Sequence, residues 1–273
     1  MNKKENFQAE AQELRKVSFH KQLPLNSKLL ELISGDNDNK FLSNSPIHNV
    51  YLYLVDYMVN LASRWFKTDA TQLNVLDWGC GKGQITFLLN ERGVSVTSAD
   101  RLDDSDDSSF GQSTPIISKT GIQVVGLEHD YLLPFADESF EIIISMGVLE
   151  HVPNELESLK EINRILKPGG LLFCFFLPYQ YSWTQNLAHL RGNFYHDRLY
   201  SKQIVMDLLS ASQFDLLDIW NRQLLPKNSV QYPNYHLFES MDQWLTDHTP
   251  IKHLGTNIEF TATKSSRSVE IGS

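Results

Sequence analysis

Cysteine is scarce in this sequence, and long hydrophobic runs are absent. The 273 residues include two cysteines, Cys80 and Cys174, which fall in different expected elements. A disulfide framework is therefore not expected, and the protein is expected in a reducing compartment. No stretch approaches the roughly 18 to 20 continuous apolar residues of a membrane span. The polar N-terminus also lacks the apolar segment of a signal peptide. These absences predict a cytoplasmic protein without a membrane span.

An excess of basic charge is also absent. The 24 Lys and Arg residues are outnumbered by 33 Asp and Glu residues, which gives a net charge of −9 and a pI near 5.4. Such a chain repels nucleic-acid phosphates at long range, so no nucleic-acid partner is expected and a small-molecule substrate is favoured. The composition leaves the oligomeric state open.

The chain divides into a polar N-terminal extension, residues 1–47, and one larger domain, residues 48–273. Residues 1–45 carry a turn cluster at 34–39 and predict a loosely attached helix followed by a loop. From His48 to Phe66 apolar residues recur at helical spacing, which predicts a helix with one buried stripe.

Strands and helices alternate after that helix. Pro153 is expected in the first turn of a helix that ends before the Lys167-Pro168-Gly169-Gly170 stop. The acidic, Ser-rich residues 101–119 predict a solvated connection. Five strands are expected at 73–78, 94–99, 122–127, 140–145 and 171–176, with a helix at 84–91. Each strand is followed by a helix or a long link, so a parallel sheet with helices on both faces is expected.

The C-terminal third has a different pattern. A helix near 201–211, a strand at 214–220, a short helix at 238–246 and a final strand at 257–263 are expected. Two late strands suit an edge pair in which one strand runs antiparallel. The fold class predicted is α/β, with a Rossmann-like, mostly parallel sheet.

A glycine-rich turn follows the first expected strand in the run VLDWGCGKG, residues 75–83. Glycines at alternate positions allow a tight turn and let a ligand lie against the main chain. The spacing departs from the G-x-G-x-x-G fingerprint, and Asp77 would repel a pyrophosphate. The turn therefore favours a cationic ligand with few or no phosphates.

Two more carboxylates follow the next strands. Asp100 lies 23 positions after Asp77 and closes the second strand, where open α/β sheets place a carboxylate that binds ribose hydroxyls. Asp130 ends the third strand. Alone, each of the three acids is equally well explained as a turn cap or a solvated loop residue. Their shared order along one sheet edge favours ligand binding.

These residues carry a family resemblance. The glycine turn with Asp100, HDYLLPF (129–135), FEIIISMGVLEHV (140–152) and LKEINRILKPGGLL (159–172) resemble class I S-adenosylmethionine-dependent methyltransferases. Within that family they look like the group that includes ubiquinone- and menaquinone-biosynthesis methyltransferases. The resemblance covers about residues 50 to 180. It implies S-adenosylmethionine as cofactor and S-adenosylhomocysteine as product.

Carried over by position, the resemblance implies that the glycine turn contacts the methionine part of the cofactor and that Asp77 lies near its amino group. It implies ribose contacts for Asp100 and adenine contacts for Asp130. Trp78 departs from the smaller aliphatic residue common in the family, so different packing below the turn is expected. The full expected cofactor set is Asp77, Gly79, Cys80, Gly81, Asp100, Arg101, His129, Asp130, Tyr131 and Met146.

Methyl transfer from a sulfonium requires alignment and exclusion of water, and it requires a base only when the acceptor loses a proton. His151, just after the fourth strand, is the first candidate base. It is also explained, with Glu150, as part of the junction before the next helix. No carboxylate follows the fifth strand beside Pro178, so no metal is predicted.

An aromatic-rich insertion at about 177–200 is long enough to fold over the site as a lid. His189 and His196 are further candidate catalytic residues within it. The alternative is that its aromatic residues lie in the core and its charged residues face solvent. His196 also belongs to a stretch, 196–217, that resembles a structural segment of the family.

The function predicted is S-adenosylmethionine-dependent methylation of a small organic acceptor, with oxygen as the acceptor atom. Carbon or nitrogen methylation of a quinone, lipid or sugar precursor is the alternative within enzymes. A non-catalytic module that keeps the cofactor-binding fold is the alternative of another class.

Overall fold

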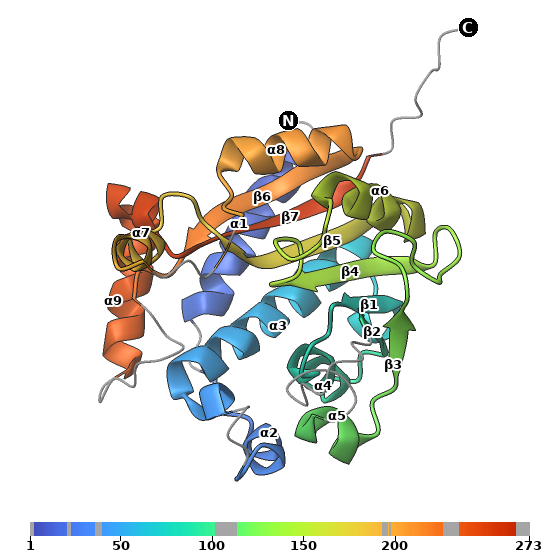
Figure 1. Cartoon of the computed structure of the whole chain (residues 1–273), viewed down its shortest axis with the longest axis horizontal. Coiled ribbons are helices and arrows are strands. Elements are labelled where there is room, and N and C mark those ends of the chain that lie inside the picture. Colours follow the sequence, from blue (N-terminus) through green and yellow to red (C-terminus); the bar gives the residue numbers. More distant parts are fainter. Residues whose placement is uncertain are drawn as a thin grey trace, which may run out of the picture.

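The computed structural model describes residues 3–20, 23–35, 40–101, 114–192, 196, 198–225 and 235–265 (Figure 1). The described strands form one seven-stranded sheet in the order β3-β2-β1-β4-β5-β7-β6. Their bounds are Val75–Trp78 (β1), Val96–Arg101 (β2), Val124–Leu127 (β3), Phe140–Met146 (β4), Leu166–Pro178 (β5), Phe214–Arg222 (β6) and Asn257–Lys264 (β7).

The first five strands run parallel to one another, and of the last two only β7 runs in the opposite direction. β7 lies between β5 and β6 and pairs antiparallel with both. In the parallel part, Asp77 of β1 is in register with Ser98 of β2 and Ile144 of β4. The predicted Rossmann-like sheet with an antiparallel late strand is confirmed.

Helices cover both faces of the sheet (Figure 1). One face packs on α1 (Lys3–His20), α3 (Ser45–Phe66) and α4 (Gln84–Asn90), and its core includes Ile144 and Phe173. The other packs on α6 (Glu155–Ile165) and α8 (Lys202–Ala211), and its core includes Ile143 and Leu172. Neighbouring strand residues thus enter opposite cores, which explains why these strands are apolar at successive positions.

The prediction of a loosely attached N-terminal helix is wrong. Ala11 and Leu14 of α1 are buried in the core beside α3 and β6. Arg15 Nε donates to Asp218 Oδ2 at 3.0 Å, and both side chains are buried. A buried pair holds only when its partners are fixed, so α1 is an integral part of the fold. Short helices α2 (Ser27–Leu32) and η1 (Lys40–Ser43) follow it, while 36–39 lie outside the described residues.

Three expected boundaries differ. Helix α6 begins at Glu155, after the N-cap Asn154, whose side chain accepts from two amides, so Pro153 precedes the helix. Residues 167–170 follow the helix as expected, but they belong to β5. Part of the expected solvated connection is helix α5 (Pro115–Thr120), and residues 102–113 lie outside the described part.

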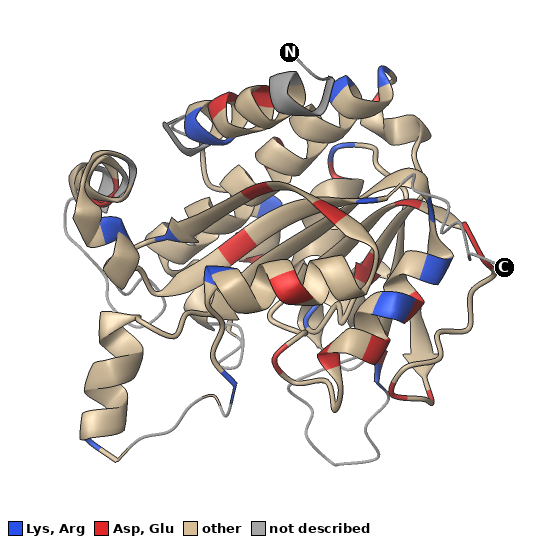
Figure 2. Cartoon of the chain, turned by 90° about the horizontal axis from the view of Figure 1, so that it is seen from above, with Lys and Arg blue, Asp and Glu red and all other residues tan. Residues whose placement is uncertain are grey.

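The C-terminal half adds α7 (Trp183–Leu190), α9 (Tyr235–His248) and η4 (Pro250–Leu254), and short η2 (Ala70–Gln72) precedes β1. Within the described residues, no helix is both long and apolar enough to span a membrane. Figure 2 shows Lys and Arg scattered over several elements rather than gathered on one helix. The insertion expected at 177–200 contains the end of β5 and α7, and residues 193–195 and 197 lie outside the described part.

Candidate functional site

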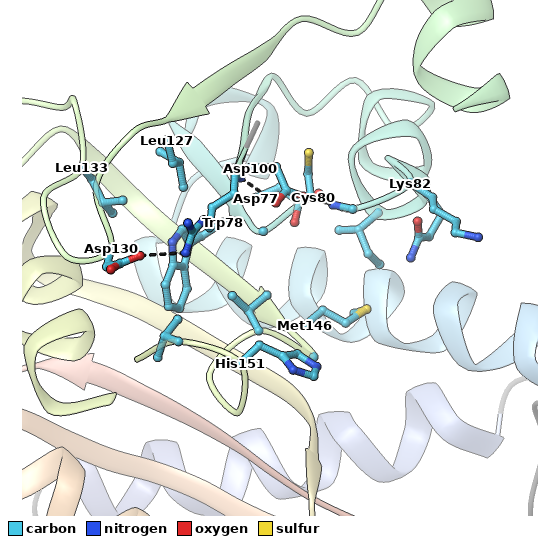
Figure 3. Close-up of a pocket in the computed structure, with 18 of the residues that line it drawn as sticks. Asp77, Trp78, Cys80, Lys82, Asp100, Leu127, Asp130, Leu133, Met146 and His151 are labelled. Atoms are coloured by element: carbon cyan, nitrogen blue, oxygen red, sulfur yellow. Dashed lines mark hydrogen bonds and ion pairs between the residues drawn. The ribbon is translucent and has the colours of Figure 1, made fainter. Parts of the chain in front are cut away.

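A cleft of about 320 Å³ opens at the carboxyl ends of β1, β2 and β4. Strand order reverses here, because β1 pairs with β2 on one side and with β4 on the other. Ligands of open α/β sheets bind at such switch points. Figure 3 shows the cleft with side chains from the glycine turn and Asp100 on one side and Met146 with His151 on the other.

The three glycines of the turn have different constraints. Gly79, Gly81 and Gly83 all have positive φ, at 70°, 52° and 80°. A Cβ on Gly79 would lie 2.4 Å from the Val148 side chain, whereas a Cβ on Gly81 would meet no atom within 4 Å. Gly79 is therefore required by packing, and Gly81 leaves the cleft open to its backbone.

Asp77 lies beneath the turn, with 2% of its surface exposed. Its Oδ2 accepts a hydrogen bond from Thr86 Oγ1 at 2.7 Å, and burial raises its pKa to about 6. Burial, with the nearby charges of Asp77 and Asp100, also raises the pKa of the Cys80 thiol. Cys80 therefore remains a thiol at neutral pH, as expected for a small loop residue rather than a nucleophile.

Asp100 is hydrogen-bonded to the glycine turn. Its Oδ2 accepts from the Gly81 amide at 2.6 Å, and its Oδ1 accepts from the Arg101 amide at 2.8 Å. A carboxylate oxygen can accept more than one hydrogen bond. These bonds hold the carboxylate next to the open glycine, where the sequence places a ribose-binding acid.

Asp130 accepts from Arg101 Nη1 at 2.7 Å, and both side chains are well exposed (Figure 3). His129, beside Asp130, also lines the cleft. Its Nδ1 accepts from the Tyr131 and Leu132 amides at 3.0 and 3.1 Å. Nine of the ten residues expected to bind the cofactor line the described cleft. The exception is Tyr131.

Trp78 also lines the cleft, although only 4% of its surface is exposed. It belongs to the core that contains Leu127 and Leu133. The indole therefore fills space between the sheet and the cleft, consistent with altered packing below the turn.

A second cavity, of about 410 Å³, adjoins the cleft. Gln84, Met146, Gly147 and His151 line both spaces. The second cavity is completed by residues from α3, the end of β5, α7 and the β6–β7 region. The volume lies within the range of about 300–1,000 Å³ that is usual for small-molecule sites.

Glu150 and two histidines meet at this cavity. Glu150 is 8% exposed, and burial raises its pKa to about 7. His151 Nε2 lies 3.8 Å from Glu150 Oε1, and the His151 and His196 ring centroids are 6.0 Å apart. One ligand-type atom from each of the three residues lies within 4.8 Å of the others, a spacing that suits a metal ion or a proton relay. The absence of a metal stays a prediction.

His189, the third candidate base, lies in α7 and is not part of either described wall. Sequence reasoning instead missed several side chains of the second cavity. They are Tyr51, Gln84, Phe176, Gln185, Gln223 and Asn257. No local motif identifies them, because they come from separate segments. The sequence presents Glu150 as part of a helix junction or as one carboxylate of a metal site, and its position next to His151 is the one signal for a role in proton transfer.

Comparisons with known proteins agree with this geometry. Residues 76–174 match a methyltransferase domain family. Over 141 residues the chain is 29% identical to the ubiquinone biosynthesis O-methyltransferase of Cereibacter sphaeroides, which covers 47% of this chain and 53% of that protein. The chain thus spans about half the length of the curated relatives it matches.

Solved structures share the fold. An S-adenosylmethionine-dependent methyltransferase from Thermotoga maritima superposes with a TM-score of 0.50 at 16% identity, over 83% of this chain and all of that one. The 4+2 cyclase SpnF gives a TM-score of 0.50 at 18% identity, over 76% of this chain and 80% of that one. Residues 76–174 therefore carry a methyltransferase domain, and the chain shares its fold with S-adenosylmethionine-dependent methyltransferases of known structure.

Proposed function

We propose that the chain transfers the methyl group of S-adenosylmethionine to an oxygen of a small organic molecule. One observation carries this proposal: the cleft at the glycine turn and a second cavity share the wall formed by Met146, Gly147 and His151. A cofactor in the first space and an acceptor in the second would meet at this wall. Such confinement aligns the two reactants and excludes water.

The cleft residues suit the cofactor. The exposed backbone at Gly81 and the buried Asp77 would hold its amino-acid part, and Asp100 would accept from the ribose hydroxyls. Asp130 and His129 would bind the adenine. The acidic lining also favours a ligand with a positive charge, because opposite charges attract strongly where water is partly excluded.

When bound, the cofactor supplies a methyl group on a positively charged sulfur. The acceptor hydroxyl has to lose its proton, and Glu150 and His151 stand where that proton would go. A carboxyl with a pKa near 7 is matched to proton acceptance at neutral pH. The exposed His151 side chain would return the proton to solvent. His196 would hold the pair in place, and α7 would close the cavity as part of a lid.

Isothermal titration with S-adenosylhomocysteine tests the cofactor part of the proposal. Binding in the micromolar range is expected, and folded protein that binds neither this molecule nor S-adenosylmethionine would refute it. Incubation of labelled S-adenosylmethionine with a library of hydroxylated, amino and quinone compounds, read by product mass, then tests the reaction. If the methyl group is found only on carbon or nitrogen, the assignment of oxygen as the acceptor atom is wrong.

The same binding and product measurements distinguish the enzyme from the alternative of a non-catalytic module. A fold can be kept without methyl transfer, and the similarity to a cyclase illustrates that fold alone does not decide activity. Here the acids at three strand ends and the adjoining second cavity favour an enzyme. Tight cofactor binding with no methylated product from any acceptor class would favour the module.

A further inference from the structure

Three buried oxygen atoms, on residues that line the second cavity, have no hydrogen-bond partner among the residues that the structure describes. They are Gln84 Oε1 from α4, Glu150 Oε2 after β4 and Gln185 Oε1 from α7. All three atoms are buried. A buried polar atom without a partner costs about 1–3 kcal/mol. Three such atoms around one cavity therefore indicate that a ligand completes them.

All three atoms are hydrogen-bond acceptors. An amide oxygen and an ionised carboxylate accept and do not donate. The Gln84 amide nitrogen lies 3.5 Å from the Tyr51 hydroxyl, and its amide oxygen has no partner among the described residues. The missing partner must therefore supply O–H or N–H groups, and it must supply more than one of them.

The charge of the cavity wall further restricts the class of ligand that can bind. Glu150 is the acidic residue of the described wall, and the remaining described lining is amide, hydroxyl, imidazole, aromatic and apolar, without lysine or arginine. Arg222 packs over the Phe176 ring at 4.2 Å, but its Nε already pairs with Glu259 Oε1 at 2.6 Å. A carboxylate or phosphate on the ligand would therefore face Glu150 without a counter-charge of its own. Burying an unpaired charge is strongly unfavourable. The wall therefore favours neutral or cationic molecules over anions.

We propose that the methyl acceptor is a compact molecule that carries several O–H or N–H groups and no negative charge. This inference rests on the proposed function and names its substrate class. The donors would pair with Gln84, Glu150 and Gln185. The stacked rings of Tyr51 and Phe176, with centroids 5.7 Å apart, supply an apolar side for the carbon skeleton. A quinone without donors would leave all three oxygens unpaired.

A matched series of six-carbon rings tests the proposal with the full chain saturated with S-adenosylhomocysteine. The probes are cyclohexane-1,2-diol, 2-aminocyclohexanol, cyclohexanol and cyclohexanecarboxylate, and binding is measured by ligand-observed NMR. The diol and the amino alcohol are expected to bind about tenfold more tightly than cyclohexanol, because one further satisfied acceptor contributes about 1.4 kcal/mol. No binding of the carboxylate is expected.

Two variants locate the effect. Gln185→Leu removes one acceptor and Glu150→Gln removes the charge, so each is expected to reduce the preference for the diol at least threefold. Glu157→Gln, an exposed carboxyl on α6 that pairs with Lys160, is the matched control and should change nothing. If Glu150→Gln does not fold, Gln185→Leu still decides the question.

Several outcomes would overturn the proposal. One is equal or tighter binding of cyclohexanol or the carboxylate. Another is tight Zn²⁺ binding that disappears in His196→Ala, which would give Glu150 a metal as its partner. Cofactor binding is measured first in the same samples. Its loss would refute the proposed function, whereas normal cofactor binding with no preference among the rings refutes only the acceptor class.

Discussion

The cofactor cleft and the second cavity are neighbours, but they are built in different ways. The cleft comes from the ends of consecutive strands and one turn, so its residues follow one another along the chain. The second cavity gathers Tyr51 from α3, Gln185 from α7 and Asn257 from β7. A local site is maintained by backbone geometry, whereas an assembled site depends on how distant helices pack. Perturbations of the two sites should therefore have different consequences.

Gly79→Ala should give the largest effect, because it disrupts the turn itself. A Cβ at this position meets Val148 at 2.4 Å, and the backbone has positive φ. Strain and overpacking together should lower the free energy of unfolding by about 2–4 kcal/mol. Chemical denaturation measures this change.

Gly81→Ala is the matched control for that prediction. It has the same sign of φ but no atom within 4 Å of the added Cβ. We expect a loss of about 1 kcal/mol of stability together with weaker S-adenosylhomocysteine binding, because the methyl group projects toward the cleft. Equal stability losses in the two variants would show that packing on Val148 does not distinguish the glycines.

Glu150→Gln should change how stability depends on pH. In the folded protein burial raises the Glu150 pKa from 4.5 to about 7, so the folded state binds this proton more tightly than the unfolded chain. The resulting stabilisation is complete below pH 4.5 and is lost as pH rises through 7. It amounts to about 3 kcal/mol.

Unfolding free energies of wild type and Glu150→Gln at pH 4.5 and pH 8.5 measure this contribution. Wild type should lose about 3 kcal/mol more than the variant over that interval. Asp77, whose pKa is raised to about 6, adds a similar loss to both proteins and cancels in the difference. Parallel pH curves would mean that Glu150 titrates as an exposed carboxyl does.

These contrasts also explain what the sequence predicts and what it does not. The Gly79–Gly83 turn, Asp100 and Asp130 are recognisable because a parallel sheet brings successive strand ends to one edge. Tyr51 and Gln185 carry no such signal, because their place depends on packing between helices. The attachment of α1 was missed for the same reason, since the Arg15–Asp218 pair joins residues that are distant in sequence.

The predicted ends of α6 were inexact where the local residues are compatible with more than one backbone structure. Asn154 rather than Pro153 caps α6, because its side chain accepts from two amides of the first turn. Pro168 and Gly169 ended the helix as expected, yet they continue as the start of β5. In both cases the residue type restricts the backbone conformation at its own position, but it does not determine where the adjacent helix or strand begins.

Asp100→Ala should weaken S-adenosylhomocysteine binding by about 1–3 kcal/mol, the usual contribution of hydrogen bonds to a charged group. The carboxylate also accepts from the Gly81 amide, so part of the loss reflects a less ordered turn. Isothermal titration measures the affinity. Asp100→Asn separates the two effects, because it can still accept from the amide while it lacks the charge. Unchanged affinity in both variants would show that Asp100 does not bind the cofactor.

Arg101→Ala should give the smallest effect of the series. The Arg101–Asp130 pair is exposed on both sides, with 64% and 39% of the side-chain surfaces accessible, so solvent screens it. We expect less than about 1 kcal/mol of change in unfolding free energy. S-adenosylhomocysteine affinity should stay within about threefold, because removal of one weak ion pair leaves Asp130 available to the adenine. A loss above about tenfold, or 1.4 kcal/mol, would instead show that the guanidinium contacts the nucleoside directly.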